Sequence, residues 1–243
     1  MNQLYPDPVS DVDVYDAYQP DDPAAPLVRI NMVTALDGHI VDAGGVSGSL
    51  GGEGDKLAFF AMRHHADALV VGASTVRAEG YGPMKIRSAW AKRRSAAGRD
   101  RPASIVVVTR SLDLDPTLTL FTAAVAPTIV LTTTDAPADR IDGLRAAGGV
   151  VIQTGEGDVD LKAGFRRLAD DHGLTHLLVE GGPNLNGQVI GAGLAQEICV
   201  TLAPVLAGGT DGKRLVEGLS SAHDLRLSTV IENHGELLLT YRL

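Results

Sequence analysis

Apolar and polar residues alternate in short blocks along most of the chain, and these blocks predict strands that alternate with helices. Residues 68–72, Ala-Leu-Val-Val-Gly, form a continuous apolar run, which is typical of a strand buried on both faces of a sheet. Further strands are predicted at 27–33, 103–108, 128–131, 150–153, 175–179 and 197–202. Helices are predicted between strands at 55–65, 138–147, 160–172 and 183–192. This pattern predicts an α/β protein.

Near the C-terminus the alternation of strands and helices gives way to adjacent strands. Strand-like segments near 225–232 and 236–242 have no helix between them and are joined by His234 and Gly235, which predicts an antiparallel hairpin. No internal repeat or interdomain linker is evident, so we expect one domain over 27–243, with three α/β/α layers and a mixed, mostly parallel sheet. Residues 1–26 contain six aspartates and no lysine or arginine, which predicts an extended arm.

Composition and charge exclude several classes of function. The formal net charge of −9 argues against nucleic-acid binding. No apolar run approaches the roughly 20 residues that span a bilayer, and the start of the chain lacks the pattern of a signal peptide. Cys199 is the only cysteine, and adjacent His64 and His65 would point in different directions on a helix, so no metal site is expected. We therefore expect a cytoplasmic protein that acts on a small molecule.

The segment 177–187, Leu-Leu-Val-Glu-Gly-Gly-Pro-Asn-Leu-Asn-Gly, is the main candidate for a ligand site. It predicts a buried strand, a tight turn and a helix that begins at Pro183. The unpaired N–H groups of such a helix would face a bound phosphate, and Glu180 would lie at the carboxyl end of the strand. The alternative is a plain strand-to-helix turn with a solvated glutamate.

Other segments add to this candidate site. Polar residues and glycines also follow the strands at 37–38, 72–75 and 109–111, and parallel strands would bring these ends to one sheet edge. The usual Gly-x-Gly-x-x-Gly and Walker signatures are absent. The glycine-rich loop 44–52 is expected to serve the site or to move. Segment 85–101, with seven basic residues, one acid and Trp90, is expected to be a solvated helix or loop, with a flap that holds an anionic ligand as the alternative.

Five motifs follow one another along the chain. They are Thr-Ala-Leu-Asp-Gly at 34–38, Met-Arg-His-His-Ala-Asp-Ala at 62–68, Val-Gly-Ala-Ser-Thr-Val at 71–76, Val-Glu-Gly-Gly-Pro at 179–183 and Ala-Pro-Val-Leu-Ala-Gly-Gly at 203–209. In this order they resemble the reductase domain of bacterial riboflavin-biosynthesis deaminase/reductase proteins, which has the dihydrofolate-reductase fold. The similarity is greatest to stand-alone actinobacterial pyrimidine-reductase-like proteins. The zinc signature of the deaminase half is absent.

The resemblance implies an NADPH-dependent reductase of a ribosylaminopyrimidine phosphate, like the 5-amino-6-(5-phosphoribosylamino)uracil reductases of riboflavin biosynthesis. Hydride would reach the ribose C1′ once the sugar ring opens to an imine, which gives the ribitylamino product. The resemblance also implies a homodimer, with the late strands and the turn at 203–209 as interface candidates. The apolar strand Leu237–Leu239, which would otherwise be an exposed edge, supports that expectation.

The resemblance also assigns residues to roles. Asp37 and Glu180 are the expected catalytic residues. Cofactor binding is expected from Gly72, Thr75, Val76, Thr109, Arg110, Ser111, Gly181, Gly182, Pro183, Asn184 and Leu185. Substrate binding is expected from Thr34, Asp37, Ser49, Arg63 and Glu180. The glycine turn would meet the pyrophosphate, and Arg110 with Ser111 would hold the 2′-phosphate of the adenosine. Each of three residues also has an alternative, purely structural role. Asp37 could be a turn residue, Arg110 a surface charge and Thr75 a helix cap.

Two segments depart from the family pattern where the substrate is expected. The chain reads Arg-Ala-Glu-Gly-Tyr-Gly-Pro at 77–83, where pathway reductases typically have Asp-Asp-Pro and a phosphate-binding arginine. It reads Ser-Leu-Gly-Gly at 49–52, where they have Ser-Trp-Ile-Ser. A reductase of dihydrofolate or another pterin, and a non-catalytic NADPH-binding protein of the same fold, therefore remain alternatives.

Overall fold

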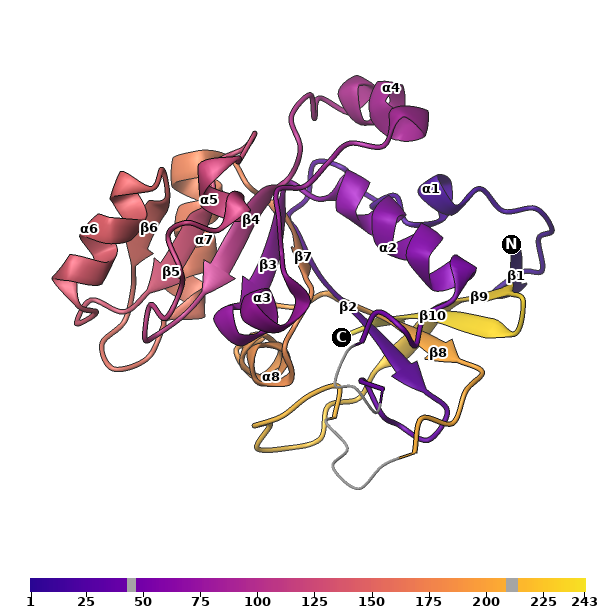
Figure 1. Ribbon diagram of the computed structural model, residues 1–243. Coiled ribbons are helices and arrows are strands. Elements are labelled where there is room, and N and C mark those ends of the chain that lie inside the picture. The colour runs from indigo at the N-terminus through magenta and orange to yellow at the C-terminus, as the bar shows by residue number, and fades with distance from the viewer. Residues whose placement is uncertain (43–46, 209–213) are drawn as a thin grey trace. The chain divides into compact units, whose positions relative to one another are not determined.

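The computed structural model describes residues 1–42, 47–208 and 214–243. These residues form two compact units (Figure 1). The first unit consists of Met1–His65 and Leu178–Leu243, and the second consists of Ala66–Leu177. Among the described helices, none is both long enough and apolar enough to cross a membrane.

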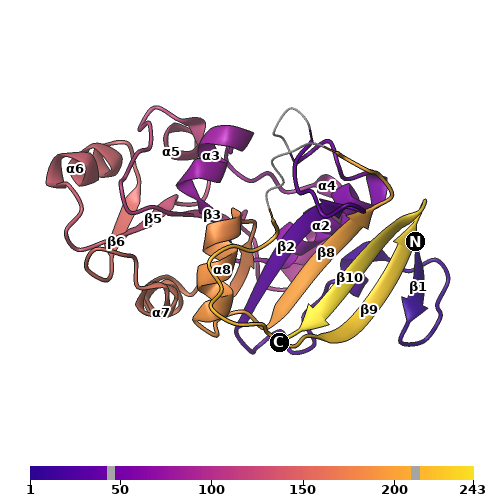
Figure 2. The ribbon, with the colours of Figure 1, turned by 90° about the horizontal axis from the view of Figure 1, so that it is seen from below.

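The first unit is built on a mixed sheet (Figure 2). Its strands have the order β1 (Asn2–Tyr5), β9 (Arg226–Asn233), β10 (Glu236–Arg242), β8 (Glu197–Ala203) and β2 (Leu27–Ala35). The pairs β1–β9, β9–β10 and β10–β8 are antiparallel, whereas the pair β8–β2 is parallel. The helices of this unit are α1 (Val14–Ala17), α2 (Glu53–His65) and α8 (Pro183–Gly191). The strand β7 (His176–Val179) includes the point in the chain where the second unit ends and the first resumes.

The second unit has a parallel sheet, as its sequence predicts. Its strands are β3 (Ala68–Gly72), β4 (Ser104–Val108), β5 (Ile129–Thr132) and β6 (Val150–Gln153), each paired with the next. Residues 68–71 have 0% of their surface exposed, which explains their continuous apolar run. The helices are α3 (Ala73–Glu79), α4 (Ser88–Ala96), α5 (Thr119–Thr122), α6 (Ala138–Ala146) and α7 (Leu161–His172). Of these, α5 was not expected.

Residues 1–26 are not a free extended arm. They contribute β1, which pairs with β9, and the short helix α1. Tyr15 and Tyr18 are buried, with 4% and 3% of their surfaces exposed. One of the acidic residues that suggested an arm is a helix cap: the Asp13 side chain accepts hydrogen bonds from the N–H groups of Tyr15 and Asp16.

The predicted C-terminal hairpin is present, but its apolar strand is not at an edge. β10 is paired with β9 on one side and β8 on the other, over Leu237–Arg242 in both cases. The apolar residues Leu237–Leu239 therefore lie inside the sheet, and they give no support to a dimer interface. The expectation of an exposed edge was wrong, because a run of apolar residues does not show whether a strand has one neighbour or two.

The helix α2 begins two residues earlier than predicted. Its first turn is bonded to a residue near the C-terminus of the chain: the Glu236 carboxylate accepts hydrogen bonds from the N–H groups of Gly52 and Gly54, at 2.6 and 2.8 Å. Glu236 is buried, with 4% of its surface exposed. A carboxylate at a helix N-terminus satisfies orphan N–H groups and is favoured by the helix dipole.

Candidate functional site

The segment after β7 has the predicted strand–turn–helix form. Gly181 has φ +87° and forms a cis peptide with Gly182, which is the N-cap of α8 and is followed by Pro183 at the first helical position. A Cβ on Gly181 would lie 3.3 Å from Met32 Sδ of β2. The left-handed backbone favours glycine here, and a Cβ would also require the Met32 side chain to shift slightly.

The first turn of α8 can hold an anionic group. Among the described residues no side chain caps it, and Gly182 at the N-cap has no side chain to accept its N–H groups. The helix has nine residues, and Asn184 is exposed while Leu185 is buried. The N–H groups of a first helical turn and the positive end of a helix dipole together suit a phosphate, so this turn fits the pyrophosphate of a dinucleotide.

A later segment packs across α8, which the sequence did not reveal. The Asn186 side chain donates to Leu215 O at 2.9 Å, and Glu217 N donates to Pro183 O at 3.0 Å. A Cβ on Gly187 would lie 1.7 Å from Glu217 O, so only glycine allows this close approach. The segment thus fixes the start of the helix that follows the glycine turn.

Glu180 is not a solvated glutamate. It is buried, with 3% of its side chain exposed, and forms a two-point ion pair with Arg63 of α2. Arg63 Nε donates to Glu180 Oε1 and Arg63 Nη2 to Glu180 Oε2, both at 2.7 Å. The Arg63 guanidinium also lies 4.0 Å above the centre of the Phe59 ring. The structure therefore brings together two of the predicted substrate residues, in the geometry of an ionised carboxylate held by a guanidinium fork.

Asp37 lies in the turn after β2 and is held as a carboxylate. Its Oδ2 accepts a hydrogen bond from Gly208 N at 2.8 Å, and its Oδ1 lies 3.1 Å from His39 Nδ1. The hydrogen bond from Gly208, with smaller contributions from His39, lowers the pKa of Asp37 to about 2. Asp37 is therefore ionised at neutral pH, and its contact with Gly208 joins two of the recognised motifs.

The two hydroxyl groups predicted for substrate binding both donate hydrogen bonds to residues close in sequence. Thr34 is buried, and its Oγ1 donates to Ala35 O at 3.1 Å. Ser49 is exposed and donates to Asp42 Oδ2 at 2.6 Å. Residues 44–46 of the predicted glycine-rich loop, and Gly209 of the predicted interface turn, lie outside the described residues.

The remaining predicted cofactor residues belong to the second unit. Gly72 is the N-cap of α3, with Thr75 half-buried and Val76 buried on that helix. Thr75 is therefore not the helix cap. After β4, Thr109 Oγ1 accepts from Leu112 N at 3.1 Å and Ser111 Oγ from Asp113 N at 3.4 Å. Arg110, between them, is exposed.

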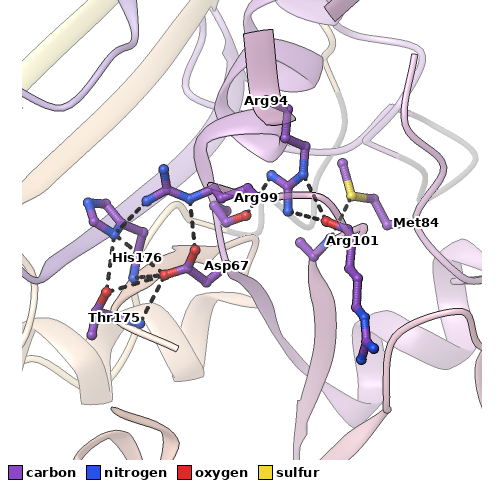
Figure 3. A network of polar contacts seen from close by, with 9 residues as sticks. Asp67, Met84, Arg94, Arg99, Arg101, Thr175 and His176 are labelled. Carbon is purple, nitrogen blue, oxygen red and sulfur yellow. Dashed lines mark hydrogen bonds and ion pairs between the residues drawn. The ribbon is translucent and has the colours of Figure 1, made fainter. Parts of the chain in front are cut away.

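Two arginines of the basic segment 85–101 are structural rather than solvated. Arg94 has 2% of its surface exposed and donates to the carbonyls of Ala66 and Arg101. Arg99 Nε donates to Asp67 Oδ1 at 2.8 Å, and Arg99 Nη2 lies 2.9 Å from His176 Nδ1 (Figure 3). Charge patterning alone missed these contacts, because their partners are backbone carbonyls and residues distant in sequence.

Comparison with known proteins identifies the family. Residues 26–237 match the family described as the RibD C-terminal domain. The chain belongs to this family. A reductase of Methanothermobacter thermautotrophicus, named 2,5-diamino-6-ribosylamino-4(3H)-pyrimidinone 5′-phosphate reductase, is 34% identical over 193 residues, which are 79% of this chain and 84% of the relative. A reductase of the same name from Archaeoglobus fulgidus is 28% identical. The matched region covers 87% of this chain and 94% of the length of that relative.

Solved structures confirm the predicted fold. A pyrimidine reductase-like protein of Corynebacterium diphtheriae is 25% identical and superposes with a TM-score of 0.83, over 95% of this chain and 98% of its own. RibD of Acinetobacter baumannii gives a TM-score of 0.71 at 20% identity, over 90% of this chain and 58% of the longer protein. The predicted α/β fold is therefore confirmed, as is the likeness to stand-alone pyrimidine-reductase-like proteins.

Proposed function

We propose that the protein is an NADPH-dependent reductase of a ribosylaminopyrimidine phosphate in riboflavin biosynthesis. The observation that carries the proposal is the family membership, with an archaeal relative of 34% identity that is named as a reductase of such a compound. The first turn of α8 and the paired carboxylate next to it supply matching chemistry. NADPH would provide the hydride that reduces C1′ of the opened ribose.

The residues of the first unit would bind and orient the reactants. Gly181, Gly182 and Pro183 open a helix whose N–H groups suit the pyrophosphate. Glu180 and Arg63, fixed by two hydrogen bonds of 2.7 Å, would present a rigid polar pair to the substrate. In the second unit, exposed Arg110 is the group we assign to the 2′-phosphate, for which a guanidinium fork is suited.

Two pyrimidines are candidate substrates, since they differ only in whether the base has been deaminated. The archaeal relatives are named for the 2,5-diamino-pyrimidinone, whereas the motif resemblance implies 5-amino-6-(5-phosphoribosylamino)uracil. Initial rates of NADPH oxidation with each compound at equal concentration decide between them. The same assay with dihydrofolate tests the pterin alternative, which the changed segments at 49–52 and 77–83 leave open.

The proposal has clear outcomes. Turnover of either ribosylaminopyrimidine, with the ribitylamino product identified by mass, supports it. NADPH binding without oxidation by any of the three compounds would instead favour a non-catalytic nucleotide-binding protein. A homodimer is also proposed, on the family resemblance alone, and a single monomer species in sedimentation at micromolar concentration would contradict it.

A further inference from the structure

The second unit contains a cavity that lies away from the predicted cofactor residues. Its volume is about 450 Å³, and its lining includes Asp67, Ser104 and Ile129, at or next to the residues where β3, β4 and β5 begin. The predicted cofactor residues Gly72 and Thr109 lie at the other ends of β3 and β4. These two strands are parallel and have five residues each, so about 16 Å separates the two edges of the sheet. The cavity is therefore separate from the site proposed for the cofactor.

Two arginines in the wall of the cavity are fixed by contacts within the unit. Arg94 is buried, and its Nε, Nη1 and Nη2 donate to the backbone carbonyls of Ala66 and Arg101 at 2.7 to 2.9 Å. Arg99 Nε donates to Asp67 Oδ1 at 2.8 Å, and 13% of the Arg99 side chain is exposed. Hydrogen bonds from charged donors in a mostly buried setting hold this wall in one arrangement, so little order has to be created when a ligand binds.

The carboxylates of the cavity have hydrogen-bond partners, whereas three of its donors have none. Both oxygens of Asp67 accept hydrogen bonds from within the unit, and Asp100 accepts one from a serine hydroxyl of α4. Among the described residues, no hydrogen bond or ion pair is made by the side chains of Arg101, His172 and Ser104, which all line the cavity. Ser104 is buried, with 6% of its surface exposed. A guanidinium, an imidazole and a hydroxyl can each donate a hydrogen bond to a ligand.

The charge and size of the cavity indicate the chemistry of that ligand. Its lining has three arginines against two aspartates, a formal charge of +1, although the whole chain has −9. Its volume lies in the range of small-molecule sites, about 300–1,000 Å³. A phosphate monoester presents three acceptor oxygens in different directions, which suits donors that come from separate segments, whereas one arginine fork suffices for a planar carboxylate.

We propose that this cavity binds a small molecule through a phosphate monoester group, which Arg101, His172 and Ser104 hold. Arg101 lies before β4 and Ser104 begins that strand, while His172 is the last residue of α7. The three donors thus reach the phosphate from two segments that are distant in sequence. The inference does not rest on the proposed function, because the cavity and the predicted cofactor residues lie at opposite edges of the sheet.

The test uses glycerol 3-phosphate as the probe and glycerol as its uncharged control. The ring signals of His172 in the proton NMR spectrum are identified by their loss in His172→Gln. At constant pH, we expect glycerol 3-phosphate to shift these signals until the site is saturated, and glycerol to leave them in place. Arg101→Ala keeps the backbone carbonyl that Arg94 holds, and it should raise the Kd about 10-fold. Ser104→Ala should raise the Kd about 3-fold.

The matched control is Arg110→Ala, which removes another exposed arginine of the same unit, at the opposite edge of the sheet. It should leave the titration of the His172 signals unchanged. The inference is wrong if the signals show no saturable shift, if glycerol shifts them equally, or if Arg101→Ala binds the probe as tightly as the wild type. A loss of affinity in Arg110→Ala in place of Arg101→Ala would also overturn it. Neither NADPH nor a pyrimidine is present, so these outcomes are independent of the proposed activity.

Discussion

Replacing Asp67 by asparagine should destabilise the second unit by about 1.5–3 kcal/mol. The carboxylate has 15% of its side chain exposed and lies at the centre of the network in Figure 3. Its Oδ2 accepts from Thr175 N at 3.0 Å and His176 N at 2.9 Å, and its Oδ1 accepts from Arg99 Nε at 2.8 Å. Asparagine keeps one oxygen for the backbone N–H groups but turns an NH₂ group toward Arg99. One hydrogen bond to a charged group is thereby lost, which is worth about 1.5–3 kcal/mol.

The sign of the pH dependence follows from the same contacts. Burial raises the pKa of Asp67, but the hydrogen bonds from His176 and the charge of Arg99 outweigh it and hold the pKa well below its usual range. A depressed pKa in the folded state stabilises the protein above the pKa of the unfolded chain, about 3.9 for aspartate. The stability difference between wild type and Asp67→Asn should be constant from pH 7 to about pH 5 and smaller at about pH 3.

Urea unfolding measures this difference. Trp90 is the only tryptophan and lies on α4, so its fluorescence reports on the second unit. The matched control is Asp171→Asn, which removes an exposed pair with Arg167 and should cost about 0.5 kcal/mol or less. Equal losses in the two variants, or an Asp67→Asn loss that is the same at pH 3 as at pH 7, would refute the reasoning.

Three further predictions concern other contacts. Gly181→Ala should weaken NADPH binding in fluorescence titrations by at least about 10-fold, because a side chain is strained at φ +87° and meets Met32; unchanged affinity would contradict this. Arg110→Ala should raise the Kd for NADPH about 10-fold and leave that for NADH unaltered, and a parallel change in both would exclude contact with the 2′-phosphate. Glu236→Ala should lower the free energy of unfolding by about 2 kcal/mol, seen by circular dichroism, because Gly52 N and Gly54 N lose their acceptors; Glu232→Ala, at the neighbouring turn, is the control.

The sequence by itself determined most of the secondary structure. The strands β3 to β6 and the helices α6 to α8 lie within a residue or two of their predicted bounds, because apolar runs and periodic faces arise from burial of each segment. It also determined the glycine turn at 181–182, since a left-handed backbone restricts the residue type locally. Ordered motifs then identified the family before any contact was known.

Tertiary structure alone decided which polar groups meet. Glu180 pairs with Arg63 across 117 positions of sequence, and Glu236 reaches Gly52 across 184. The burial of Arg94 and of the tyrosines in residues 1–26, and the place of β10 inside its sheet, likewise depend on distant partners. A local pattern records whether a segment is buried, but not which side chain satisfies a buried charge. That choice makes Glu180 a carboxylate fixed by Arg63 rather than a solvated one.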